Sequence, residues 1–335
     1  MKQQSSISRR AALTSVGMAG LLALAACAGT TGTTPSDNGD SYPEHTIELV
    51  VPFAAGGSVD LTARALAAKL EGIWNVSVTV TNQPGGNTLP AVQQMLRSNP
   101  DGYTLLMDSQ GSSSMLPVAI QGIDIDPTER TSLVTATSTP QIFFVAETSP
   151  LRTFEDAVEY MKENPTTFTW TSLGGAGVQD YVFRKLFRAL DIDAAGTRAV
   201  SLAGGSAAVT EAAGGHVDIG ASSWGAIKAL YEGGKIRVLA VADDERFYAL
   251  PDVPTTTEVG LPDVQVSIWI GVSGPAGLPE NVISRWEEGV KEALSDKSLQ
   301  EQFENLGLIA NYSSSADASD ALSEETDVVR TLWAQ

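Results

Sequence analysis

Three glycine-rich segments offer the clearest binding chemistry in this sequence of 335 residues. They are residues 52–60 (PFAAGGSVD), 171–177 (TSLGGAG) and 203–206 (AGGS). Each follows a short apolar run and precedes an amphipathic stretch, so each is expected between a strand and a helix. Glycine lets the backbone approach a ligand closely, and the first turn of a helix presents unpaired N–H groups. The segments therefore predict an anion site built from backbone amides, although ordinary strand–helix turns also use glycine.

Patterns for catalysis or for a cofactor are weak. Neither His45 nor His216 has a neighbouring Cys, His or Glu at the spacing of metal ligands, and the sequence lacks the Gly-x-Ser-x-Gly motif of a nucleophile elbow. None of the glycine-rich segments has the spacing of a dinucleotide-binding or P-loop motif. Asp60 has two interpretations, since it could cap its helix or reach the solvent shell of a ligand. We therefore predict no catalytic residues, no metal, no cofactor and no enzymatic activity.

Length and charge limit the class of protein. A chain of 335 residues is long enough for two domains. The formal net charge of -19 repels nucleic acid and anionic membranes, so neither is expected as a partner.

The N-terminus has the pattern of an export signal. Lys2, Arg9 and Arg10 precede an uncharged apolar run, residues 11–26, which is shorter than the ~20 residues needed to span a bilayer. The run ends in Leu-Ala-Ala followed by Cys27, which resembles a bacterial lipobox. We expect a signal peptide at 1–26, lipidation of Cys27 and a flexible tether at 27–42; export by the general or by the twin-arginine route stays open. An incidental cysteine is the alternative, and a single cysteine excludes an intramolecular disulfide.

Alternating strand and helix patterns continue from residue 45 onward. Strands are expected at 47–53, 76–80 and 103–107, separated by helices at 58–70 and 90–97, which is a βαβαβ unit with a parallel sheet. A second series of strands is expected at 142–146, 168–171, 198–202, 217–221, 236–242 and 264–272, with helices between them and at the C-terminal end. Two successive series predict two α/β lobes.

Several of these motifs, in this order, resemble the Bug family, the extracytoplasmic receptors of tripartite tricarboxylate transporters. The resemblance rests on IELVVPFAAGGSVDLTARALAAKL, NQPGGN, NPDGYTLLM, AVSLAGGSAAVTEAAGGHVDIG, GGKIRVLAV, LPDVPTTTEVGLPDV and WIGVSGPAGLPENVISRW, and it covers residues 42 to the end. It implies a two-lobed α/β fold of the type II periplasmic-binding-protein kind, with crossing strands near 143–146 and 241–264. The implied lobes are 43–145 with 250–335, and 146–249.

The resemblance also implies a function and a site. A small carboxylate would be held between the lobes by backbone amides and waters, then delivered to a membrane permease by a monomeric, lipid-anchored receptor. An enzyme or a sensor acting on a carboxylate with the same fold is the alternative. The implied ligand-binding residues are Phe53, Ala55, Gly56, Gly57, Ser58, Asp60, Gln110, Gly111, Ser172, Gly174, Gly175, Gly177, Gly204 and Gly205. Two departures from the family pattern, Leu202-Ala203 and Asp180, leave the identity of the acid open.

Overall fold

The computed structural model describes residues 42–120, 122–175, 177–202 and 205–334. The predicted signal peptide, Cys27 and nearly all of the predicted tether lie outside these residues, as does Gly204. Within the described ranges, no helix combines the length and the apolar character that a membrane span requires.

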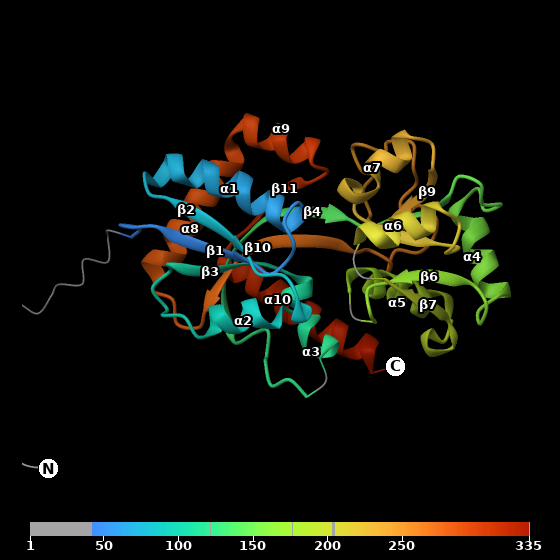
Figure 1. Ribbon diagram of the computed structural model, residues 1–335, viewed down its shortest axis with the longest axis horizontal. Helices are drawn as coiled ribbons and strands as arrows, with labels where there is room; N and C mark the ends of the chain where they lie inside the picture. The colour runs from blue at the N-terminus through green and yellow to red at the C-terminus, as the bar shows by residue number, and fades with distance from the viewer. Residues whose placement is uncertain (1–41, 121, 176, 203–204, 335) are drawn as a thin grey trace, which may run out of the picture. The chain divides into compact units, whose positions relative to one another are not determined.

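The first sheet has six strands in the order β11-β4-β10-β3-β1-β2 (Figure 1). Its strands are β1 (Ile47–Val51), β2 (Val78–Asn82), β3 (Thr104–Ser109), β4 (Arg130–Pro140), β10 (Ser267–Pro275) and β11 (Ile309–Ser313). β1 pairs in parallel with β2 and with β3, which confirms the predicted βαβαβ unit. β10 and β11 pair antiparallel to β4, so the sheet is mixed. We call this sheet and the helices on it the first lobe.

Alternating side chains of β1 explain how this sheet is covered on both faces. Ile47 and Leu49 enter the core formed with α1 (Ser58–Trp74) and α8 (Glu280–Ser295). Val50 points to the other face, into the cluster formed with α2 (Leu89–Leu96). Because successive residues of a strand face opposite sides, the apolar run IELVV must be buried on both.

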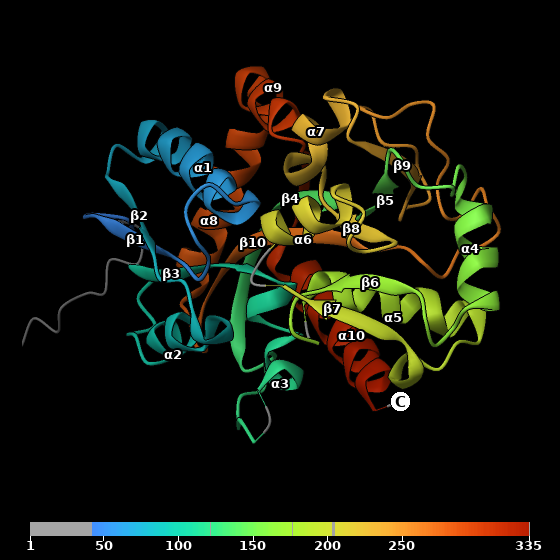
Figure 2. The ribbon, with the colours of Figure 1, turned by 45° about the vertical axis from the view of Figure 1, so that its right-hand side comes forward.

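The second lobe contains the two smaller sheets. One has the order β8-β5-β9 and the other pairs β6 with β7. The strands are β5 (Ile142–Ala146), β6 (Thr169–Ser172), β7 (Arg198–Ser201), β8 (Gly220–Ser222) and β9 (Ile236–Val241). An isolated bridge between Trp170 and Ile219 links the β6 side to the segment before β8. The helices are α4 (Phe154–Glu163), α5 (Val178–Leu190), α6 (Gly205–Ala213) and α7 (Trp224–Glu232), which Figure 2 shows around these strands.

The remaining elements are short turns of 3-10 helix, the short α-helix α3 and the C-terminal helices. They are η1 (Gly86–Thr88), η2 (Gln110–Ser112), α3 (Leu116–Ala119), η3 (Ala194–Gly196), α9 (Lys297–Asn305) and α10 (Ser315–Trp333). The sequence does not predict β4, the longest strand of the described residues, because RTSLVTATSTP is mostly polar. β4 is nonetheless buried along nearly its whole length between β10 and β11.

The predicted lobe boundaries at 145/146 and 249/250 need correction. β5 pairs with β8 and β9, so the chain crosses to the second lobe at Gln141, between β4 and β5. Val264 and Val266 pack in the core of the second lobe, so the return crossing lies just before β10. The two crossings touch, because Gln141 donates its N–H to the carbonyl oxygen of Val266 at 2.9 Å. The two crossings therefore lie side by side where the lobes join.

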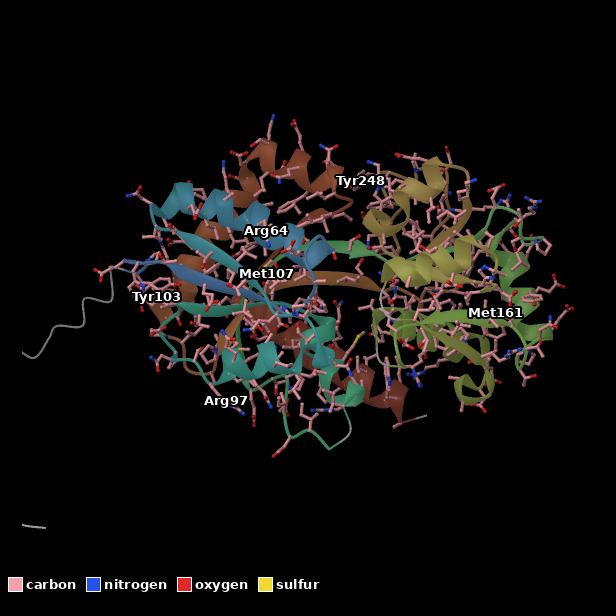
Figure 3. All side chains as sticks on the ribbon, in the orientation of Figure 1. Arg64, Arg97, Tyr103, Met107, Met161 and Tyr248 are labelled. Carbon is pink, nitrogen blue, oxygen red and sulfur yellow. The ribbon has the colours of Figure 1, made fainter. Side chains whose placement is uncertain are left out.

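The lobes also meet away from the crossings. The hydroxyl of Tyr248 donates to the carbonyl oxygen of Glu304 in α9 at 2.6 Å, and Figure 3 shows Tyr248 near the end of that helix. The turn after α9 packs against the start of α7, where a Cβ on Gly307 would come within 2.6 Å of the Trp224 ring.

Candidate functional site

The first glycine-rich segment connects β1 to α1 at the carboxyl end of the parallel strands. Ala55, Gly56 and Gly57 are exposed, while Phe53 and Ser58 are half-buried. Gly56 has a φ of +85°, a conformation that an L side chain rarely adopts, so the turn depends on glycine here.

Asp60 organises this segment from inside. Its carboxylate accepts hydrogen bonds from the Gly56 N–H at 2.8 Å, from Asn82 Nδ2 at 2.9 Å and from Arg64 Nε at 3.1 Å. Burial by itself would raise the pKa of Asp60, but the bonds from Arg64, Gly56 and Asn82 outweigh it and lower that pKa. Figure 3 shows Arg64 on α1. Asn82 Nδ2 also donates to the Phe53 carbonyl oxygen at 3.1 Å. Asn82 therefore ties the start of the segment, at Phe53, to the carboxylate that holds its turn.

This arrangement decides between the two interpretations of Asp60. The side chain is only 2% exposed and caps the turn, so it is a positioning residue rather than a ligand contact. The N–H of Gly56 is bonded to Asp60 in this structure, and a contact of Gly56 with a ligand stays a prediction.

The first turn of α1 nevertheless keeps open donors. The N-cap residue is Gly57, which has no side chain to cap the helix. Among the described residues, no acceptor is hydrogen-bonded to the N–H groups of Gly57, Ser58 or Val59. Figures 1 and 2 both show this end of α1 on the side of the first lobe toward α6.

Gln110 and Gly111 follow β3 and have different roles. Gln110 is 1% exposed, and its side chain is bonded to β10: Nε2 donates to the Ser267 carbonyl oxygen at 2.8 Å, and Oε1 accepts from the Trp269 N–H at 3.2 Å. The side-chain amide thus extends the β3–β10 pairing, and the place of Gln110 in the first-lobe wall of the site stays a prediction. Gly111 lies against the Phe53 ring, where a Cβ would come within 3.2 Å of Phe53 Cζ.

The second glycine-rich segment, between β6 and α5, has the same internal design as the first. The fully buried carboxylate of Asp180 accepts from Ser172 Oγ at 2.5 Å, from the Leu173 N–H at 3.0 Å and from the Gly177 N–H at 2.9 Å. Ser172 Oγ in turn lies 3.2 Å from the amide nitrogens of Gly174 and Gly175, which donate to it.

These bonds change what the second segment can offer a ligand. The amides of Gly174, Gly175 and Gly177 were predicted to hold an anion, but each already has an acceptor within the segment. In this conformation they cannot each bind an anion directly without giving up a bond. From the sequence, Asp180 is only a departure from the family pattern, and its role in holding this segment is not predicted. A signal existed, because Gly-x-x-Asp occurs both at residues 57–60 and at residues 177–180.

The third segment lies beside the second one. The N–H of Leu202 donates to the Ser172 carbonyl oxygen at 3.0 Å, as expected for the ends of the paired strands β6 and β7. Gly205 is the first residue of α6, and Gly204 lies outside the described residues. The predicted site therefore has one part on the first lobe, where Phe53 and Gly111 meet, and another on the second lobe, where the two segments meet.

The histidines and acidic residues show no metal-binding arrangement within the described ranges, where no group of three His, Cys, Asp or Glu could hold an ion. His45 stacks on Tyr103 with ring centroids 3.6 Å apart.

Comparison with known proteins agrees with this architecture. The family described as tripartite tricarboxylate transporter family receptor matches residues 62–332. BugT of Bordetella pertussis is 29% identical over 275 residues, which cover 80% of this chain and 82% of BugT. The structure of the periplasmic binding protein BugD has a TM-score of 0.74 and 25% identity, covering 87% of this chain and 97% of BugD. MatC from Rhodopseudomonas palustris with bound malate has a TM-score of 0.76 and 23% identity, covering 87% of this chain and all of MatC (100%).

The two-lobed periplasmic-binding-protein fold predicted from the sequence is thereby confirmed. Since the family match spans most of the chain, and since Bug proteins stand among its relatives in both sequence and structure, the protein belongs to the receptor family of tripartite tricarboxylate transporters.

Proposed function

We propose that this receptor is an extracytoplasmic lipoprotein that captures a small organic acid between its lobes and delivers it to the membrane subunits of a tripartite tricarboxylate transporter. Membership of a receptor family supports solute binding outside the cytoplasm rather than catalysis. MatC, whose fold this chain shares, holds malate, which supports a carboxylate as the ligand here.

The observation that carries the proposal is the open first turn of α1. The N–H groups of Gly57, Ser58 and Val59 have no acceptor among the described residues, and residues 52–60 contain a single charged side chain, the acid Asp60. A carboxylate there would accept backbone hydrogen bonds and meet the positive end of a 17-residue helix. Bonds of this charge-assisted kind contribute about 1.5–3 kcal/mol each. An acidic protein can in this way bind an anion without a lysine or arginine in the loop.

Closure of the two lobes would complete the capture. We expect the segments after β6 and β7 to approach the acid held at α1 as the lobes turn about Gln141 and Val266. Such a change requires that the acid bind the closed form more tightly than the open form. Backbone and water contacts from the second lobe would supply that difference.

The proposal is tested by isothermal titration of the purified receptor with dicarboxylates, tricarboxylates, acidic amino acids and aromatic acids. We expect at least one of these acids to bind with micromolar or tighter affinity. Binding of none of them would refute the carboxylate assignment, and turnover of a bound acid would favour an enzyme.

One variant tests the α1 amides directly. Ser58→Pro removes a single N–H at the first position of the helix, where proline is tolerated because its φ is already helical. The preceding Gly57, with φ -80° and ψ 166°, suits a residue before proline. We expect the affinity for the acid to fall by about tenfold or more with little change in melting temperature. Lys297→Pro, at the first position of α9, is the matched control and should bind like the wild type.

The lipid anchor has its own test. We expect the mature protein to begin at Cys27 with acyl chains attached, as seen by mass spectrometry of protein extracted from membranes. Cys27→Ala should release the receptor from the membrane fraction, and a variant that stays membrane-bound would contradict the assignment.

A further inference from the structure

The C-terminal helix α10 joins the cores of both lobes. Near its start, the hydroxyl of Ser315 donates to the Ser132 carbonyl oxygen in β4 at 2.5 Å. In its middle, Glu325 accepts hydrogen bonds from Ser114 and from the indole of Trp269 in β10. Towards its end, Val329 and Leu332 are buried in the core of the second lobe. α10 is therefore a further link between the lobes, besides the two crossings and the contacts that α9 and the turn after it make with the second lobe.

The last turn of α10 reaches the second glycine-rich segment. The indole Nε1 of Trp333 donates to the carbonyl oxygen of Gly175 at 2.7 Å. The Trp333 ring lies nearly parallel to Tyr181, with centroids 6.3 Å apart, and the Arg184 guanidinium sits 4.8 Å above it. Arg184 Nη1 also donates to the Leu332 carbonyl oxygen at 3.2 Å. Tyr181 and Arg184 belong to α5, the helix that follows this segment. α5 therefore contacts the last turn of α10 and also positions the second glycine-rich segment.

The segment needs such support because its backbone is intrinsically free. Gly174 and Gly175 have φ values of +89° and +92°, and a Cβ on either would meet no atom within 4 Å. Consecutive glycines in open space lose much conformational freedom when they are ordered. Ser172 and Asp180 hold the N–H groups of the segment, whereas Trp333 holds the carbonyl of Gly175 from the other side.

We propose that Trp333 is a positioning residue that orders the Gly174–Gly175 turn for the ligand and couples its conformation to the seating of α10 on both lobes. The part of this inference that concerns the ligand rests on the proposed function, whereas the ordering of the turn does not. In a receptor that opens and closes, a change in how α10 packs on the two lobes would then change the conformation of the Gly174–Gly175 turn through Trp333.

The ordering is tested without a ligand by hydrogen exchange of the full chain. Trp333→Phe keeps a ring over Arg184 but removes the N–H that bonds to Gly175. We expect the amides of Gly174, Gly175 and Gly177 to exchange about fivefold faster, which corresponds to the loss of one hydrogen bond of about 1 kcal/mol. Trp286→Phe is the matched control, because it removes the 2.8 Å bond from Trp286 Nε1 to the Tyr42 hydroxyl in the first lobe. Unchanged exchange at these three glycines in Trp333→Phe, or the same change in both variants, would overturn the inference.

The coupling to the ligand is tested by titration of the same variants with malate, adipate and any other acid that the wild type binds. We expect Trp333→Phe to bind several-fold more weakly and Trp286→Phe to bind as the wild type does. If the wild type binds no acid, the proposed function fails while the exchange result still stands. If the wild type binds and Trp333→Phe binds equally well, the coupling to the ligand fails while the proposed function stands.

Discussion

Glu325 makes the stability of this receptor depend on pH in a way that one substitution should remove. The residue is half-buried as a whole, but its carboxyl group is enclosed and accepts hydrogen bonds from Ser114 and, at 3.1 Å, from Trp269 Nε1. Burial raises the pKa of Glu325 to about 7; hydrogen bonds from Ser114, Trp269 and Gln110 oppose the increase, and repulsion from Asp108 adds to it.

The size and sign of the effect follow from the two states of the chain. The folded pKa of about 7 lies above the ordinary value of 4.5 that the unfolded chain should show. The folded protein therefore holds the proton more tightly, so the stabilising contribution is complete below about pH 4.5 and is lost as the pH rises through 7. At about 1.4 kcal/mol for each pKa unit, this loss amounts to about 3 kcal/mol, of which about 2.5 kcal/mol falls between pH 5 and 8.

The assay is urea unfolding at pH 5 and pH 8, followed by circular dichroism. Glu325→Gln keeps an acceptor oxygen for Trp269 but cannot ionise. The free energy of unfolding of the wild type, relative to this variant, should fall by about 2.5 kcal/mol from pH 5 to pH 8. Glu324→Gln changes an exposed neighbour on the same helix and should follow the wild type. Parallel pH curves for wild type and Glu325→Gln would refute the reasoning.

Two further predictions concern packing and buried hydrogen bonds, with urea unfolding as the measurement. Asp180→Ala leaves the Ser172 hydroxyl and two backbone N–H groups without their acceptor, so the free energy of unfolding should fall by about 2–4 kcal/mol; an unchanged value would contradict the role given to Asp180. Gly289→Ala places a Cβ 2.5 Å from the ring of Trp74 and should destabilise by about 1–3 kcal/mol, although alanine favours a helix. Gly72→Ala, at a helical position with no atom within 4 Å, should instead stabilise by about 0.5–1 kcal/mol, and the same sign for both glycines would show that the ring contact is unimportant.

The sequence by itself determined the first βαβαβ unit and the places of the glycine-rich segments between strands and helices. A β-branched run such as IELVV is a strand in almost any context, and glycines followed by an amphipathic stretch mark a strand–helix turn. The family motifs then sufficed to identify the two-lobed receptor. β4 escaped prediction because its threonines and serines show no apolar period. Only pairing with β10 and β11 makes it a central strand, in which Thr137 is fully buried and lies 3.2 Å from the Thr62 hydroxyl.

The structure decided which amides of the glycine-rich segments bond to the chain itself and which stay open. Glycine spacing shows where amides can converge, but it does not show which of them bond to the chain itself. Asp60 and Asp180 accept hydrogen bonds from the turns before their helices. The side chain of Gln110 bonds to β10, and Trp333, near the end of α10, donates to Gly175. The bonds of Gln110 and Trp333 join residues distant in sequence, so no local pattern reports them, whereas Asp60 and Asp180 accept from amides only a few residues away. The N–H groups of Gly57, Ser58 and Val59 in the first turn of α1 stay open among the described residues.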